Sequence, residues 1–101
     1  MRVCPVGELD LSTVGEVRAQ LDELRSAGFS RLILDLRRAT FLDSSGVRLA
    51  FDVHAASVAA GTEFAIVPGP EDVQRTFEVA GLSDRLPFIG SRGQRDGTAW
   101  G

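Results

Sequence analysis

Hydrophobic and polar positions form two kinds of pattern along this chain, and each pattern predicts the structure of its segments. In three segments apolar residues recur every three to four positions, the pattern of a helix with one buried face. These segments are residues 14–27, 45–60 and 71–80. Residues 31–36 and 63–67 are short, nearly continuous apolar runs, typical of strands that helices cover on both faces. Residues 2–6 predict only a shortened first strand, because Pro5 cannot donate to a ladder.

The same pattern predicts which side chains are buried and where the helices end. Thr13 and Glu16 have the spacing of a capping box at the start of the first helix. The buried stripes expected in the three helices are Val14, Val17, Leu21 and Leu24; then Val47, Ala50, Phe51, His54 and Val58; then Val73, Phe77 and Ala80. Residues 7–10 and 37–40 are expected to be a turn and a loop, and residues 82–89 a docked turn and last strand.

Strands that alternate with helices predict an α/β fold, here a small mixed, mostly parallel sheet of about four strands packed with helices. The chain has 101 residues, enough for one domain with one core. We expect that domain to span residues 1–90 and the polar, glycine-rich residues 91–101 to be a flexible tail.

Composition narrows the classes of partner and cofactor. The formal net charge of −3 offers no basic field for nucleic acid or an anionic membrane. The 11 basic residues are all arginine, scattered along the chain, which indicates a GC-rich genome rather than a functional surface. Cys4 is the single cysteine, so no internal disulfide or cysteine-based metal cluster is expected. No phosphate-binding glycine motif, signal peptide or membrane span is present, and we expect a cytoplasmic protein without a cofactor or metal of its own.

The most informative stretch is residues 41–46, Phe-Leu-Asp-Ser-Ser-Gly, which joins a strand pattern to a helix pattern. A serine at such a junction can be a helix cap, a nucleophile or a phosphorylation site, because free N–H groups and the positive end of the dipole favour an added anion. Asp10 and Asp43 can likewise be ordinary caps or turn residues.

A serine hydrolase is the enzymatic alternative, and the spacing excludes it. A nucleophilic Ser44 needs a base within hydrogen-bond reach, and His54 is the chain's one histidine. Ten residues of helix separate the two by about 15 Å. We therefore expect a protein that is not an enzyme, with His54 packed as a structural side chain. Asp35 is expected at a strand end, bonded to a loop backbone.

Four blocks of sequence together resemble the STAS domain family, and within it the bacterial anti-sigma factor antagonists. The blocks are Gly-Glu-Leu-Asp-Leu-Ser-Thr at 7–13, Leu-Ile-Leu-Asp-Leu at 32–36, Phe-Leu-Asp-Ser-Ser-Gly at 41–46 and Ala-Gly-Leu at 80–82. The resemblance covers about residues 7–90, with the blocks in the family's order.

The resemblance implies partner switching. The unphosphorylated antagonist binds an anti-sigma factor that is also a serine kinase, and so frees a sigma factor. The kinase, with its own ATP and magnesium, phosphorylates the serine after the motif aspartate, which is Ser44 here, and a serine phosphatase reverses the mark. Asp10 is expected near Ser44, and we expect the partner-binding residues to be Asp10, Asp43, Ser44, Ser45, Gly46 and Arg48.

Several points stay open in the sequence. Ser45 can be a cap or a supporting hydroxyl, and Gly46 can admit a partner backbone or relieve crowding at the turn. The chain departs from the family's pattern in two places. Only six residues precede Gly7, where the family usually has a further strand and hairpin, and this predicts an incompletely covered sheet edge and a monomer or weak homodimer. Arg48 stands in place of a small residue. The alternative function is a STAS accessory or scaffold module of a transporter, lipid-trafficking or signalling complex, without a phosphorylation switch.

Overall fold

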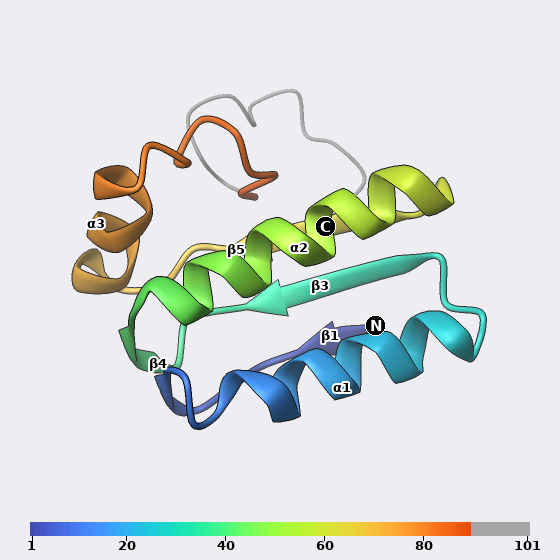
Figure 1. The fold of residues 1–101 in the computed structure, drawn as a ribbon, viewed down its shortest axis with the longest axis horizontal. Coiled ribbons are helices and arrows are strands. Elements are labelled where there is room, and N and C mark those ends of the chain that lie inside the picture. The colour runs from blue at the N-terminus through green and yellow to red at the C-terminus, as the bar shows by residue number, and fades with distance from the viewer. Residues whose placement is uncertain (90–101) are drawn as a thin grey trace.

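The computed structural model of the chain describes residues 1–89, in which strands and helices alternate along most of the sequence (Figure 1). In chain order the elements are β1 (Arg2–Val3), β2 (Gly7–Leu9), α1 (Val14–Ser26), β3 (Arg31–Asp35), β4 (Ala39–Leu42), α2 (Ser44–Ala60), β5 (Glu63–Val67) and α3 (Glu71–Val79). The three predicted helices are confirmed, each to within one residue at either end. The tail expected at residues 91–101 lies outside the described residues.

The described strands form two parallel ladders. In the larger, of order β1-β3-β5, the central strand β3 pairs with β5 from Arg31 opposite Glu63 to Asp35 opposite Val67. In the smaller, β2 pairs with β4, and Leu9 lies opposite Leu42. The predicted α/β class with mostly parallel strands is confirmed. The difference from the prediction is that five strands in two ladders replace about four strands in one sheet.

The smaller ladder comes from segments that the pattern had predicted to be a turn and a loop. Strand β2 has three residues, and Leu9 is its one buried side chain. In β4 the buried residues Ala39 and Leu42 flank two exposed ones, so the strand shows no alternation. Strands this short carry too few apolar positions to show a strand pattern in the sequence. Their backbone hydrogen bonds to each other are what make them strands.

Helices α1 and α2 lie side by side on one face of the larger ladder, and α3 packs against β4 (Figure 1). The predicted stripe of α1 is confirmed: Val17 and Leu21 are buried, with Val14 and Leu24 packed against the same core. Leu32, Leu34 and Ile66 of the larger ladder are fully buried in that core.

The predicted stripe of α2 is wrong in part, because the buried face is rotated. Val47 and Ala50 are buried as expected, but Phe51 is 46% exposed and Val58 67% exposed, and His54 is half-buried. The core instead receives Leu49, Val53 and Ser57. Apolar residues occur on two faces of this helix, and the sequence period alone does not say which face meets the sheet.

Two smaller predictions about helix ends also need correction. Thr13 is the N-cap of α1, but its side chain makes no cap hydrogen bond, so the capping box does not form. The Thr13 hydroxyl donates to the Glu8 carbonyl (2.8 Å) and accepts from the Asp10 N–H (2.9 Å), which braces the preceding turn. In α3, Val73 and Phe77 are buried as predicted, whereas Ala80 lies past the helix end and is exposed.

Residues 82–89 dock on the core as predicted. Leu86 and Phe88 are buried, and Phe88 packs edge-on against Phe77, with ring centroids 5.1 Å apart. The expected last strand is reduced to one parallel bridge, between Phe88 and Ile66.

A buried carboxylate, Asp35, ties the end of β3 to the edge strand and to the loop that follows. It is 1% exposed and accepts hydrogen bonds from Arg37 Nη2 (2.8 Å), the Arg37 N–H (3.0 Å) and Arg2 Nη1 (3.0 Å). The Arg37 side-chain hydrogen bond, more than any other contact, lowers the pKa of Asp35 below its usual 3.8. The expected structural role at a strand end is confirmed, and two arginines join the loop backbone as partners.

Asp35→Asn should lower the free energy of unfolding at pH 7 by about 1.5–3 kcal/mol, the range for hydrogen bonds to a charged group. The side chains of Arg2 and Arg37 are 48% and 62% exposed, so water can solvate them when the carboxylate is removed. Their loss of a partner therefore adds little to the fall in stability. A lowered folded-state pKa gives stability that is present above the unfolded pKa and is lost as pH falls through the folded value. Urea unfolding between pH 7 and pH 2 should therefore show a smaller acid loss in Asp35→Asn than in wild type.

Glu23→Gln, at an exposed position on α1, is the matched control and should change stability by less than about 0.5 kcal/mol. Equal losses in the two variants at pH 7, or one pH profile shared by wild type and Asp35→Asn, would contradict the role given to Asp35.

Gly46 sets how closely α2 approaches the smaller ladder. A Cβ placed on Gly46 would lie 2.7 Å from Leu42 Cγ and 3.0 Å from the Leu9 carbonyl oxygen. Gly46 is buried, so of the two roles open in the sequence the structure favours relief of crowding inside the chain. The absence of a side chain here lets the first turn of α2 rest on the ends of both β2 and β4.

Gly46→Ala should therefore destabilise the fold by about 1–3 kcal/mol, the cost of overpacking. Helix propensity alone predicts the opposite, a gain of about 1 kcal/mol. Gly15→Ala in α1 is the matched control, because a Cβ there meets nothing within 4 Å, and it should stabilise by about 0.4–1 kcal/mol. Chemical denaturation of both variants separates the two effects; a gain in stability for Gly46→Ala would refute the close contact.

Candidate functional site

The N-terminus of α2 is capped by Asp43 and by neither serine. The Asp43 carboxylate accepts from the Ser45 N–H at 2.8 Å and from the Gly46 N–H at 3.4 Å. Its backbone carbonyl accepts from the N–H groups of Gly46 and Val47. Of the alternatives left open by the sequence, the ordinary capping role therefore falls to Asp43, whose backbone is extended as an N-cap requires.

Ser44 is the first residue of α2 and is exposed, as predicted. Within residues 1–89 its hydroxyl forms no hydrogen bond to another side chain or backbone group, since Asp43 has taken the cap. Ser45, in contrast, is half-buried. Of the two adjacent hydroxyls, that of Ser44 is the one that a partner protein can reach.

Asp10 lies beside this helix start because of the strand register. Asp10 and Asp43 directly follow Leu9 and Leu42, which pair across β2 and β4, and the Asp43 N–H donates to the Leu9 carbonyl at 3.4 Å. Asp10 accepts from the Ser12 hydroxyl (2.7 Å) and the Ser12 N–H (3.0 Å), and the hydroxyl contact is the largest cause of its lowered pKa. The predicted proximity of Asp10 to the serine turn agrees with this register, and a carboxylate on each side makes the turn acidic.

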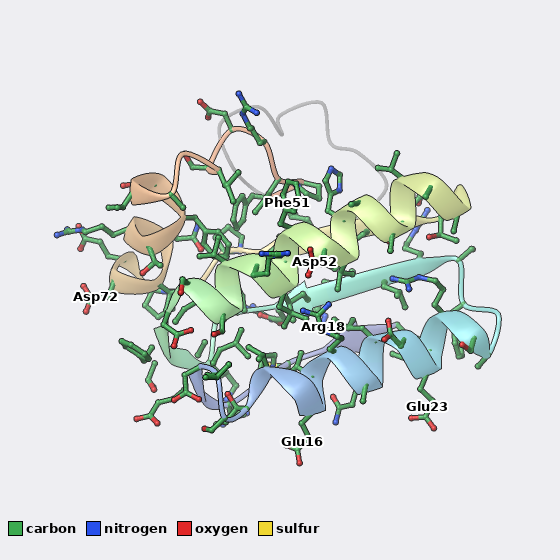
Figure 2. The ribbon with its side chains drawn as sticks, viewed as in Figure 1. Glu16, Arg18, Glu23, Phe51, Asp52 and Asp72 are labelled. Atoms are coloured by element: carbon green, nitrogen blue, oxygen red, sulfur yellow. The ribbon has the colours of Figure 1, made fainter. Side chains whose placement is uncertain are left out.

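Two grooves of about 410 Å³ each open beside Ser44, and Ser44 and Val47 line both. The first lies between α2 and α3 and is also lined by Asp72, Arg75, Thr76, Val79 and Ala80. The second runs along α2 and is also lined by Arg48, Phe51, Asp52 and Leu82. Figure 2 shows Phe51 and Asp52 on α2 near the centre of the view, and Asp72 on α3 at the left.

The contribution of α3 to this surface was missed by the sequence analysis. The Thr76 hydroxyl donates to the Leu42 carbonyl at 3.2 Å, which fixes α3 beside the strand end that leads into Ser44. Val79 is 83% exposed and lines the first groove. Its position off the buried stripe of Val73 and Phe77 was the available signal, because an apolar residue on the outer face of a helix has no place in the core.

Charged side chains border the second groove. Asp52 of α2 pairs with Arg48 one turn earlier (Nε to Oδ1, 3.2 Å) and with Arg18 of α1 (Nη2 to Oδ2, 3.3 Å). Figure 2 shows Arg18 and Asp52 facing the space between the two helices. Arg48, a candidate binding residue, is 76% exposed in its side chain and is held at this surface by Asp52 alone among the described residues.

The arrangement favours a serine that is acted upon over one that acts. His54 lies ten residues after Ser44 in the same helix, about 15 Å away at the standard rise, so it cannot serve Ser44 as a base. Within residues 1–89 no three His, Cys, Asp or Glu side chains are grouped to hold a metal ion. Nor does that part of the chain contain a helix long and apolar enough to span a bilayer.

Comparison with known proteins agrees with this geometry. The family model of the STAS domain matches residues 3–94. An anti-sigma-B factor antagonist from Staphylococcus aureus is 31% identical over 80 residues, which cover 79% of this chain and 74% of that protein.

Two solved structures share the fold. One is the anti-sigma factor antagonist SpoIIAA in its unphosphorylated form, with a TM-score of 0.73, 23% identity, and coverage of 94% of this chain and 84% of SpoIIAA. The other is an anti-sigma factor antagonist from Mycobacterium paratuberculosis, with a TM-score of 0.71, 22% identity, and coverage of 91% and 78%. The chain belongs to the STAS domain family, in the group that contains the anti-sigma factor antagonists.

Proposed function

We propose that this protein is an anti-sigma factor antagonist that binds an anti-sigma factor serine kinase, frees a sigma factor, and is switched off by phosphorylation of Ser44. The observation that carries the proposal is the exposed Ser44 hydroxyl at the start of α2, released from capping by Asp43. A kinase needs a serine whose hydroxyl is accessible and uncommitted, and Ser44 meets both conditions.

The names of the relatives support the class of partner. The Staphylococcus aureus relative is named for antagonism of an anti-sigma factor, and SpoIIAA is described in an unphosphorylated form. On this basis we propose that the partner of this chain is an anti-sigma factor that uses its own ATP and Mg²⁺ to transfer a phosphate to Ser44. A serine phosphatase would remove that phosphate. The binding, the phosphorylation and its reversal would take place in the cytoplasm.

The proposed docking surface is centred on Ser44 and comprises the exposed Ser44 and Arg48 and the half-buried Asp10 and Asp43 of the predicted set, together with the two grooves. Asp10, Asp43, Ser44 and Arg48 offer polar contacts, and Phe51 and Val79 offer apolar area on either side. Ser45 and the buried Gly46 contribute by shaping the turn.

Charge explains how phosphorylation would end the binding. A phosphoserine adds about −1.5 to −2 charge at neutral pH, next to Asp43 and Asp10. Two unit charges about 6 Å apart interact by roughly 3 kcal/mol at an effective dielectric of 20, and about 1.4 kcal/mol already weakens binding tenfold. The positive end of the α2 dipole favours an added negative charge at this helix start, so the fold survives.

Incubation with the candidate anti-sigma factor kinase, ATP and Mg²⁺, followed by mass mapping, should place one phosphate on Ser44. Ser44→Ala should bind the kinase and accept no phosphate, whereas Ser44→Asp should bind at least about tenfold more weakly, because it keeps a negative charge at the contact. Isothermal titration of each variant against the kinase measures the affinities.

Ser45→Ala is the matched control at the adjacent, half-buried hydroxyl and should still be phosphorylated on Ser44. Phosphorylation of Ser44→Ala at the wild-type stoichiometry, or equal affinities for wild type and Ser44→Asp, would refute the switch.

A further inference from the structure

We infer that, once Ser44 carries a phosphate, Arg48 leaves Asp52 and pairs with the phosphate, so that the chain supplies its own counter-charge. The inference rests on the proposed function in one respect, that Ser44 is the modified residue. It assigns to Arg48, the residue that stands where the family pattern has a small one, the role of an internal phosphate ligand.

The three side chains form one row along α2. Ser44, Arg48 and Asp52 are spaced four residues apart and line the same groove, so each lies one turn from the next. Side chains four residues apart on a helix are neighbours, with Cβ atoms about 5–6 Å from each other. Arg48 is therefore within reach of both its present partner and the Ser44 oxygen.

Helix direction favours the phosphate over Asp52. An acidic residue four positions before a basic one makes a better pair than the reverse order, and the pair of Arg48 with Asp52 has the reverse order. Long side chains in a helix point back toward its N-terminus, which carries the Arg48 guanidinium toward Ser44. The phosphate also offers about twice the charge of a carboxylate and can accept two guanidinium hydrogen bonds.

The exchange does not leave Asp52 without an ion-pair partner. Asp52 keeps Arg18 of α1, at 3.3 Å, when Arg48 departs. The Arg48 side chain is 76% exposed, so no packing has to break for it to move.

Other charges near Ser44 do not offer the same exchange. Asp43 and Asp72 are acidic and oppose the phosphate. Arg75 lines the first groove with Ser44, but it belongs to α3 and pairs with Glu71 at 3.6 Å in the favourable order, acid before base. Arg48 is the arginine that shares a helix with Ser44 at one turn's distance.

The exchange would carry the phosphorylation state into the second groove. In the unphosphorylated chain Arg48 forms an ion pair with Asp52, and both line the second groove with Phe51. In the phosphorylated chain that link is open, and Arg48 lies toward Ser44. A partner docked over Phe51 would therefore meet a changed surface as well as a new charge.

The test uses the full chain with phosphoserine installed at position 44 during translation, and follows the phosphate by ³¹P NMR from pH 4.5 to 8. The phosphate's second pKa, ordinarily about 6, should be lowered in the otherwise wild-type protein by the Arg48 guanidinium. Arg48→Gln should raise that pKa by about 0.5, the effect of losing one exposed ion pair. Asp52→Asn should lower it further, because Arg48 then has no competing partner.

Arg38→Gln, which removes an exposed charge directly before the start of β4, is the control for loss of one arginine and should leave the phosphate pKa unchanged. Arg48→Lys, which keeps the charge, should retain most of the lowering. An unchanged pKa in Arg48→Gln, or a larger rise in Arg75→Gln, would overturn the assignment. Because no kinase is needed to install the phosphate, these outcomes are independent of whether the proposed kinase modifies Ser44.

Discussion

The first turn of α2 rests on the carboxyl ends of two paired strands, and the Ser44 site depends on that contact. The register of β2 with β4 brings Leu9 and Leu42 together, and Gly46 lets the helix backbone settle onto both. Asp43, the residue between strand and helix, has an extended backbone, and its carboxylate caps the helix end. Ser44 follows as the first helical residue and points into solvent because the cap is already filled.

Around this contact the surface is divided by charge. Asp10 and Asp43 place two carboxylates at the strand ends, and the hydrogen bond from the Ser12 hydroxyl is the largest cause of the lowered pKa of Asp10. Arg48 and Arg75 approach from the two helices, each restrained by an acidic neighbour. A phosphate on Ser44 would therefore enter a region where Asp10 and Asp43 are held by hydrogen bonds to backbone N–H groups and the arginine side chains are exposed, so a local modification can rearrange the surface while the fold persists.

The sequence predicted the elements that are long enough to show an apolar pattern and missed the strands that are too short to show one. The helices and strands β3 and β5 are long enough for their apolar positions to establish a pattern, and their predicted places are confirmed. Strands β2 and β4 exist because they pair with each other, and no local pattern reports such a pairing. The orientation of α2 was wrong in part for a related reason, since Phe51 and Leu49 are equally apolar and only the position of the sheet decides between them.

At the candidate site, the motif pointed to Ser44 and Asp43, and the register agrees with the predicted position of Asp10. The grooves and the ion pairs of Asp52 could not be predicted, because they depend on how α1 and α3 are placed against α2.

The most direct test of the account is a calorimetric titration of the anti-sigma factor with the chain carrying phosphoserine at position 44, beside the unmodified chain and a chain with phosphoserine at 45. The account predicts tight binding of the unmodified chain and binding at least about tenfold weaker for phosphoserine at 44, with circular dichroism unchanged. Equal affinity for the unmodified chain and the chain phosphorylated at 44 would contradict it.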